Sequence, residues 1–325
     1  MRSPEYWKSY HASIANGKQQ VFRHCQKVVN LLGRPWQVSK RGSPPKHMPE
    51  EYAAVAIYRK YFNMVFRAAE ADTPFILGKR LDHSNIWWGL QRISARYLKR
   101  AIELLFRLIS GIFPPDIFIA DSTGISTDRY TRYRGPRLRP TDKPPPNEPK
   151  RRKNGQSGER VLKTLKLHAL VGYHIKFGLL MARSALITKS EVNDSPQLKE
   201  LLKGVRGNGE SLLLDRGYDS VRNYELGRRC GFNPVIKLRD VGPRGLVRRE
   251  MAKTFTKNRK LYRRRGLIEG VFGGLETKYG NRTRCRRPKS QRIDCLLMVV
   301  SHNLRTYMRA LALRKLEIFI LVWIY

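Results

Sequence analysis

Two short apolar runs in this chain each end in an aspartate, and this pattern constrains the fold more than any other feature. Ile117–Ala120 precedes Asp121, and Ser211–Leu214 precedes Asp215. Runs of this length and composition predict buried strands. Because open α/β sheets carry their active sites at strand ends, we expect both carboxylates to face one crevice. Taken singly, each aspartate is better explained as a cap of a turn or helix, and only the pair favours a site.

Two carboxylates held close together repel each other and have raised pKa values unless a cation lies between them. Sites built from oxygen ligands select hard cations, of which Mg²⁺ and Mn²⁺ are the usual choices. The pair of strand-ending aspartates, Asp121 and Asp215, therefore predicts a divalent metal site.

The patterns that follow Asp121 predict a mixed α/β sheet with helices around it. Alternation in 165–171 and an apolar run in 177–185 predict a β-hairpin that turns at 172–174. After the hairpin we expect a helix over 197–203, the strand before Asp215, a helix that stops at Gly231, a strand over 234–236, a helix through 261–279 and a last helix from about Ser290.

Residues 1–110 are predicted to be mainly helical. Ser84 and Ser94 are each followed by a helical pattern and are candidate N-caps. The two helices that they begin could form a helix-turn-helix that binds DNA ends, or could simply pack together. We therefore divide the chain into a helical region 1–110, a catalytic α/β domain 111–313 and an apolar tail 314–325.

The charge of the chain points to a polyanionic partner. Sixty-five Lys and Arg against 26 Asp and Glu give a net charge of +39. Such self-repulsion is best explained by nucleic acid, with a ribosome-type binder or a membrane-surface protein as alternatives. The insertion 128–160 is basic and Pro-rich, which suits a phosphate backbone as well as a solvated loop. A second basic arm contains Arg282, Arg284, Arg286 and Arg287.

Other classes of protein find little support in the sequence. The four cysteines make no C-x-x-C pair, so they predict reduced thiols rather than a disulfide framework or zinc ribbon. The first 17 residues contain no signal-peptide pattern, and the apolar run 318–325 is far shorter than a membrane span. We expect a cytoplasmic, nucleoid-associated protein that uses neither a membrane nor a small-molecule substrate.

Glu269 is the third candidate metal ligand. At helical spacing Tyr262, Arg265, Glu269 and Glu276 share one face beside an apolar stripe. An ordinary Arg265–Glu269 surface pair, worth about 0.5 kcal/mol, is the simpler interpretation. The basic segments on either side favour a phosphodiester site, where the arms hold the backbone and the acid holds metal.

Taken together, these motifs resemble the DDE transposases of prokaryotic insertion sequences, in particular insertion-sequence families four and five. The resemblance spans roughly residues 50–310. Its motifs are Asp121-Ser-Thr, Leu212-Leu-Leu-Asp215-Arg-Gly-Tyr-Asp-Ser220, the Tyr262/Arg265/Glu269 helix, Leu165-Lys-Leu-His168, Asp194-Ser-Pro-Gln-Leu198, Ser301-His-Asn-Leu304 and, weakly, Asp82-His-Ser84. The family pattern Y-x2-R-x3-E-x6-K departs at its end, because Glu276 occupies the lysine position and Lys278 lies two residues later.

The resemblance implies an RNase H-like fold and two-metal chemistry. Asp121, Asp215 and Glu269 would be the catalytic residues and would bind Mg²⁺, which Mn²⁺ could replace. Water would cut the element end, and the freed 3′-OH would attack target DNA. Contacts with double-stranded DNA are expected from Arg216, Tyr218, Tyr262, Arg265 and Lys278, together with the basic arm.

The expected function is therefore a DNA transposase that acts on terminal inverted repeats and target DNA, as a homodimer on DNA. A nuclease of the same fold would use the same three carboxylates, so the sequence leaves that alternative open. A decayed copy that only binds DNA is a further alternative, which Glu276 favours. An RNA-binding protein would explain the charge but not the strand-ending aspartates.

Overall fold

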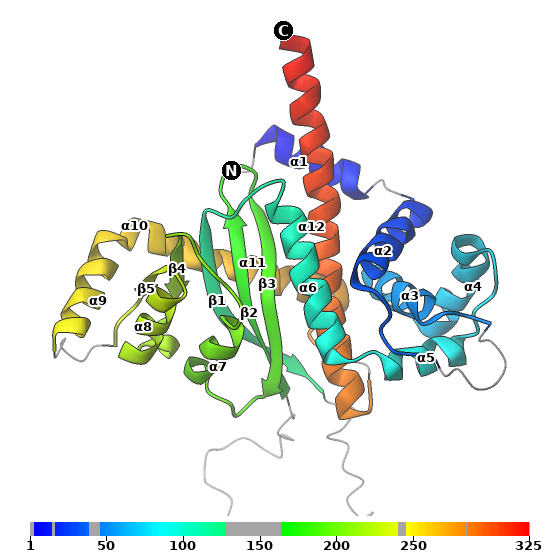
Figure 1. Ribbon diagram of the computed structural model, residues 1–325, viewed down its shortest axis with the longest axis horizontal. Coiled ribbons are helices and arrows are strands. Elements are labelled where there is room, and N and C mark those ends of the chain that lie inside the picture. Colours follow the sequence, from blue (N-terminus) through cyan, green and yellow to red (C-terminus); the bar gives the residue numbers. More distant parts are fainter. Residues whose placement is uncertain are drawn as a thin grey trace, which may run out of the picture.

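A five-stranded mixed sheet lies at the middle of the fold (Figure 1). The computed structural model describes residues 3–14, 17–38, 46–127, 164–239, 245–283 and 285–324. The strands follow the order β3-β2-β1-β4-β5, in which β1–β3 are antiparallel and β4 and β5 run parallel to β1. They are β1 (Ile117–Ser126), β2 (Thr164–His174), β3 (Leu179–Lys189), β4 (Ser211–Leu214) and β5 (Asn233–Ile236). The predicted mixed α/β class is confirmed.

In the described part of residues 1–110, six helices precede the sheet, in agreement with the mainly helical region that the sequence predicts. They are α1 (Pro4–Ile14), α2 (Lys18–Leu32), α3 (Pro49–Tyr61), α4 (Phe66–Leu77), α5 (His83–Arg92) and α6 (Ala95–Ser110). Ser94 caps α6, since its hydroxyl accepts the Tyr97 amide at 3.1 Å. The predicted cap of α5 was wrong by two residues, because the Asp82 carboxylate, and not Ser84, accepts a first-turn amide, that of Ser84 itself, at 2.8 Å.

The remaining helices follow the expected order, apart from α9, which the sequence analysis did not predict. They are α7 (Asp194–Leu201), α8 (Val221–Arg229), α9 (Leu246–Lys257), α10 (Arg259–Tyr262), α11 (Leu267–Tyr279) and α12 (Pro288–Ile324). The long helix α12 packs against α6, β3, α3 and α1 (Figure 1). Its buried Asn303 side chain accepts the Ala182 amide at 2.8 Å and donates to the Ala182 carbonyl at 2.7 Å. That exchange joins α12 to β3 near the bulge opposite Leu170 and Val171.

One continuous apolar core joins the N-terminal helices to the sheet. Val55 and Ile57 of α3, Leu105 of α6, Ile119 of β1 and Leu297 of α12 are all buried in it. A buried ion pair crosses the same interior, since the Lys60 ammonium lies 2.9 Å from the Asp294 carboxylate. The division at residue 110 remains a prediction, and the insertion 128–160 lies outside the described residues.

Three boundaries differ from the sequence expectation. Strand β1 does not stop at Asp121, because its antiparallel pairing with β2 continues to Ser126 after its pairing with β4 has ended. The hairpin turns at 175–178 rather than 172–174, since pairing persists to His174 and Leu179. The helix expected through 261–279 is interrupted by a 3₁₀ turn, Arg263–Gly266, that ends on a weak helix former.

The apolar tail belongs to the end of α12, which continues to Ile324. None of the helices in the described part of the chain combines the length and the hydropathy that a membrane span requires.

Candidate functional site

Asp121 and Asp215 follow two paired strands in matching register. Ala120 of β1 pairs with Leu214 of β4 in the parallel ladder, so the next residue on each strand is an aspartate. Each carboxylate is held by a local amide: Asp121 Oδ1 accepts the Ser122 N–H, and Asp215 Oδ1 accepts the Gly217 N–H, both at 2.8 Å. The sheet therefore places the two carboxylates at the same edge, as the strand pattern predicts.

The electrostatics of Asp121 reflect this crowding. Burial raises the pKa of its carboxyl above the ordinary value of 3.8, and the negative charge of Asp215 raises it further. The Ser122 amide and the Arg265 guanidinium act in the opposite direction. A bound cation would reduce both the repulsion between the two carboxylates and the cost of burying the charge of Asp121.

Arg265 links this pair to Glu269. Its Nη1 donates to Asp121 Oδ2 at 2.7 Å and its Nη2 to Glu269 Oε1 at 3.3 Å. The Asp121 side chain is 17% exposed and that of Glu269 is 69% exposed, so the two bonds differ in their surroundings. Ligand atoms from the three predicted carboxylates do not all come within 4.8 Å of one another in this structure.

The donor set nevertheless fits a hard divalent cation. Asp121 and Asp215 offer carboxylate oxygens from the sheet, and Glu269 offers a third carboxylate from the first turn of α11. The Arg265 guanidinium already places a positive charge beside Asp121, where a metal cation would bind. The arrangement can bind a cation between two fixed carboxylates, with the exposed carboxylate of Glu269 as a further ligand from the first turn of α11.

The aromatic and basic residues predicted near the carboxylates occupy different environments. Arg216 is exposed directly after Asp215, whereas the Tyr218 ring is completely buried and its hydroxyl has no hydrogen-bond partner among the described residues. Tyr262 is half-buried against Phe255, with ring centroids 5.0 Å apart, and burial raises the pKa of its phenol. Tyr218 therefore offers no surface for a direct contact in this conformation.

The more distant predicted residues lie away from the carboxylates. Arg282 pairs with Ser126 at the far end of β1, and Arg287 lies over the Trp87 ring at 5.5 Å. Arg286 lines the same surface as Arg287, near the start of α12. Lys278 is nine residues after Glu269 and so emerges on the opposite side of α11. Arg284 lies outside the described residues.

A fourth carboxylate close to the site was missed by the sequence analysis. Asp194 Oδ1 accepts the Ser122 hydroxyl at 2.8 Å, and the Lys166 ammonium lies 3.0 Å from the same oxygen. The His168 Nδ1 atom is 3.2 Å away from it. In the sequence Asp194 begins a helix and belongs to one of the motifs of the resemblance, but it was not predicted as a site residue; its position follows from the pairing of Ser122 with His168 across β1 and β2.

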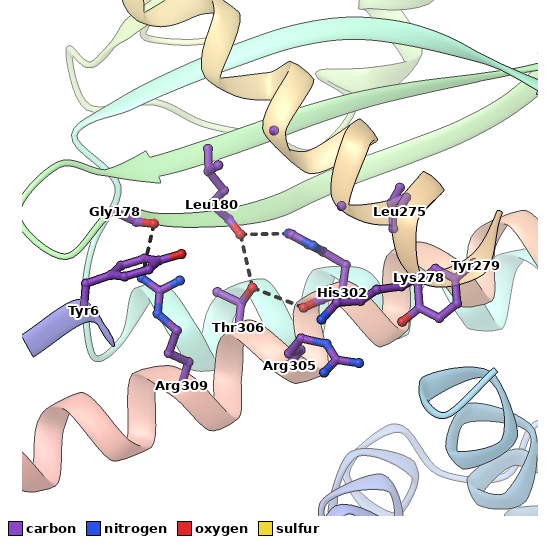
Figure 2. A pocket seen from close by; sticks show the side chains of 12 residues that line it. Tyr6, Gly178, Leu180, Leu275, Lys278, Tyr279, His302, Arg305, Thr306 and Arg309 are labelled. Atoms are coloured by element: carbon purple, nitrogen blue, oxygen red, sulfur yellow. Dashed lines mark hydrogen bonds between the residues drawn. The ribbon is translucent and has the colours of Figure 1, made fainter. Parts of the chain in front are cut away.

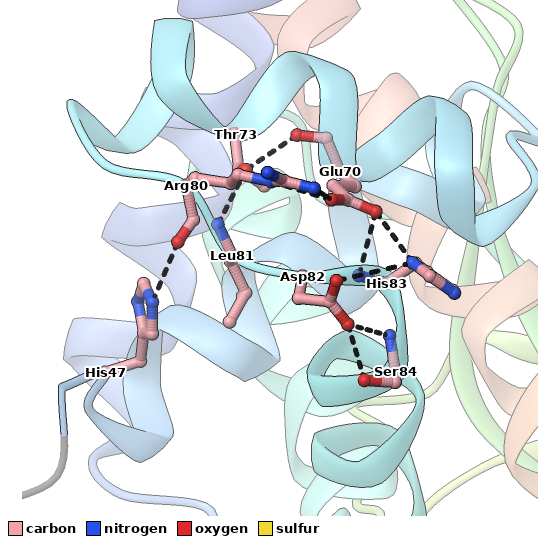
Figure 3. A network of polar contacts seen from close by, with 8 residues as sticks. All are labelled: His47, Glu70, Thr73, Arg80, Leu81, Asp82, His83 and Ser84. Carbon is pink, nitrogen blue, oxygen red and sulfur yellow. Dashed lines mark hydrogen bonds and ion pairs between the residues drawn. The ribbon is translucent and has the colours of Figure 1, made fainter.

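A second acidic cluster lies in the N-terminal helices (Figure 3). Ligand atoms of Glu70, Asp82 and His83 all lie within 4.8 Å of one another. Their oxygens are already engaged: Glu70 accepts Arg80 Nε at 2.8 Å and the His83 amide at 3.1 Å, and Asp82 accepts the Ser84 amide. These contacts join the end of α4 to the start of α5, so the cluster has a structural role.

Comparison with known proteins gives one family match. The family model described as "Transposase DDE domain" matches residues 112–304, which is more than half of the chain. None of the curated proteins matches the sequence. Among solved structures, a piggyBac transposase synaptic complex with hairpin DNA, determined by cryo-EM, aligns with 11% identity and a TM-score of 0.36, covering 95% of this chain and 81% of that one.

Proposed function

The chain belongs to the transposase DDE domain family, and from that premise we propose that it cuts DNA at the ends of an insertion sequence and joins them to target DNA. We assign it to insertion-sequence families four and five, with an RNase H-like catalytic domain over 111–313. One observation carries the proposal: Asp121 and Asp215 follow the paired residues Ala120 and Leu214 of two parallel strands. A nuclease site of this class needs two carboxylates fixed at one sheet edge.

Asp121, Asp215 and Glu269 would hold the divalent metal, for which Mg²⁺ is the expected ion and Mn²⁺ a substitute. When bound, the metal supplies a nucleophilic oxygen at neutral pH and neutralises charge on the leaving 3′ oxygen. The protein's part is to fix the two buried carboxylates by the Ser122 and Gly217 amides. Arg265 favours the ionised form of Asp121 through a 2.7 Å bond and also donates to Glu269 at 3.3 Å, which would keep that carboxylate near the pair.

DNA would approach over the exposed basic surface around this edge. Arg216 lies next to Asp215, and Arg282 follows the end of α11 beside β1. Together with Arg265, Tyr262, Arg284, Arg286 and Arg287 they would hold phosphates and position the scissile strand. Tyr218, being buried, would act by supporting the turn after Asp215, and Lys278 would act from the other side of α11. Pairing of two element ends would require a dimer on DNA.

The test uses the DNA that flanks the gene as substrate, incubated with purified protein and Mg²⁺. We expect cuts at paired inverted repeats and joined products. Asp121→Asn, Asp215→Asn and Glu269→Gln should abolish cutting while leaving DNA binding largely intact.

Glu276→Gln is the matched control, because it removes a carboxylate from the same face of α11, seven residues from Glu269, and should retain cutting. Full cutting by any of the three site variants would overturn the ligand assignment. Cuts scattered along the DNA without joined products would show that the protein is a nuclease and not a transposase. DNA binding without cutting would show that it is a decayed copy.

A further inference from the structure

A cavity of about 200 Å³ lies between α11 and α12 (Figure 2). Helix α12 lines it with His302, Arg305, Thr306 and Arg309, and β3 contributes the backbone at Leu180. Nothing in the proposed cleavage reaction uses these residues. The cavity is therefore a feature of the fold that needs its own explanation.

The cavity exists because one face of α11 lacks side chains. Gly270, Gly274 and Lys278 are spaced by four residues, so they share that face, and all three line the cavity. A Cβ atom added at Gly270 or Gly274 would meet no other atom within 4 Å. Glycine is a poor residue for a helix interior, so two such positions on one face indicate that space is maintained there at the expense of helix stability.

The charge inside the cavity has one sign. Lys278, Arg305 and Arg309 bring three cations to its walls, and none of the described residues that line it is acidic. The Lys278 ammonium has no ion pair or hydrogen bond in the described part of the chain. Burial, and to a smaller extent Arg305, lowers the pKa of Lys278 to about 8. An unpaired, partly buried cation is costly, and a bound anion would compensate it.

The two arginines are held in place by backbone contacts. Arg305 donates to the Tyr61 carbonyl at 3.3 Å and lies over the Tyr61 ring at 4.3 Å. Arg309 donates to the Phe177 carbonyl at 2.6 Å and lies over the Tyr6 ring at 4.0 Å. The contacts of Arg305 fix its guanidinium group without neutralising it, since a carbonyl and a ring carry no net charge. Arg305 and Lys278 therefore bring positive charge that a ligand in the cavity can meet.

We propose that this cavity binds a phosphate group, with Lys278, Arg305 and Arg309 as the recognising cations. Guanidinium and ammonium donors match the charge and the several acceptor oxygens of a phosphate. The volume leaves room for the phosphate and part of the molecule that bears it. The phosphate belongs either to the DNA backbone, in which case the inference rests on the proposed function, or to a free phosphorylated ligand.

The test compares two glycine variants of the full chain. Gly274→Glu places a carboxylate inside the cavity, whereas Gly273→Glu adds the same charge on the neighbouring residue, which does not line it. Binding of inorganic phosphate is measured by calorimetry, with circular dichroism to verify folding. We expect binding to fall about tenfold or more in Gly274→Glu and to stay within about twofold in Gly273→Glu. Lys278→Met, which removes a cation without adding bulk, should weaken binding in the same direction.

The DNA arm of the test measures duplex binding against salt concentration. If the phosphate is that of DNA, the slope of log affinity against log salt concentration should be smaller in Gly274→Glu and Lys278→Met than in Gly273→Glu, by about the amount that one phosphate contact contributes. If the ligand is free, DNA binding is unchanged and only inorganic phosphate binding falls. The proposal is overturned if the parent binds no phosphate and neither cavity variant differs from Gly273→Glu in DNA binding. Asp121→Asn, assayed in parallel, should lose cutting and keep phosphate binding, so failure of the proposed function is seen separately.

Discussion

Arg265 is expected to stabilise the metal-free protein while competing with metal for Asp121. Its Nη1 lies 2.7 Å from Asp121 Oδ2, and the two side chains are only 22% and 17% exposed. A hydrogen bond between charged groups in such surroundings is worth about 1.5–3 kcal/mol. The second bond, at 3.3 Å to a Glu269 side chain that is 69% exposed, adds at most about 0.5 kcal/mol. Arg265→Gln should therefore cost about 2 kcal/mol, or roughly 4 °C in the melting temperature.

In the presence of Mg²⁺ the same variant should behave in the opposite way. With Asp121 Oδ2 no longer bound to a guanidinium, Mg²⁺ has a freer ligand and should raise the melting temperature of Arg265→Gln by more than that of the parent. The assay is thermal unfolding in EDTA and over a series of Mg²⁺ concentrations.

Arg263→Gln is the control, because it removes the same charge from the same 3₁₀ turn at an exposed residue. Two results would refute this reasoning: an equal loss of stability in Arg263→Gln and Arg265→Gln without metal, or a Mg²⁺ effect in Arg265→Gln no larger than in the parent.

Three further outcomes follow from buried charges. Lys60→Met should cost up to about 3 kcal/mol in urea unfolding, because it removes the 2.9 Å partner of the buried Asp294 carboxylate and leaves it Arg59, at 3.7 Å, as its ion-pair partner among the described residues. Because the folded pKa of Asp121 is raised above 3.8, the parent loses stability as pH rises through that pKa. Asp121→Asn should therefore have a larger free energy of unfolding than the parent at pH 7 in EDTA, but not at pH 3. If the difference between variant and parent in urea unfolding were the same at both pH values, the raised pKa of Asp121 would be contradicted. Lys278→Met should gain about 1 kcal/mol at pH 7 without phosphate, a modest value because the half-exposed ammonium is screened, and the gain should shrink from about pH 8 upward, as unfolding at pH 7 and pH 10 would reveal.

Local signals made several parts of this structure predictable. The strand before Asp215 and the cap at Ser94 depend on residues adjacent in the chain, and both occur where the sequence predicts them. The placement of Asp121 and Asp215 directly after the paired residues Ala120 and Leu214 was also predictable, because similar strand segments of an α/β sheet bring the residues that follow them together.

Other features of the site depend on contacts between distant segments. Arg265 and Asp121 are 144 residues apart in the sequence, so no local pattern predicts the hydrogen bond between them. The helical spacing of Arg265 and Glu269 predicts only the local pair. Asp194 reaches Ser122 across 72 residues, for the same reason. The 3₁₀ turn at Arg263–Gly266 also interrupts the single helix that the sequence predicts through 261–279.

The sequence by itself determined most of the order of the elements, the aspartates that follow two buried apolar segments and the strong positive charge, because each depends on composition or on neighbours along the chain. Only the tertiary structure decided that Arg265 is the cationic partner of Asp121 and that two glycines of α11 line a cavity. Gly274 weakens a helix when considered alone, and its purpose appears only when α12 brings Arg305 and Arg309 to face the space that it leaves. The surroundings of these residues depend on packing between segments that are distant in the sequence, and local propensity does not predict such packing.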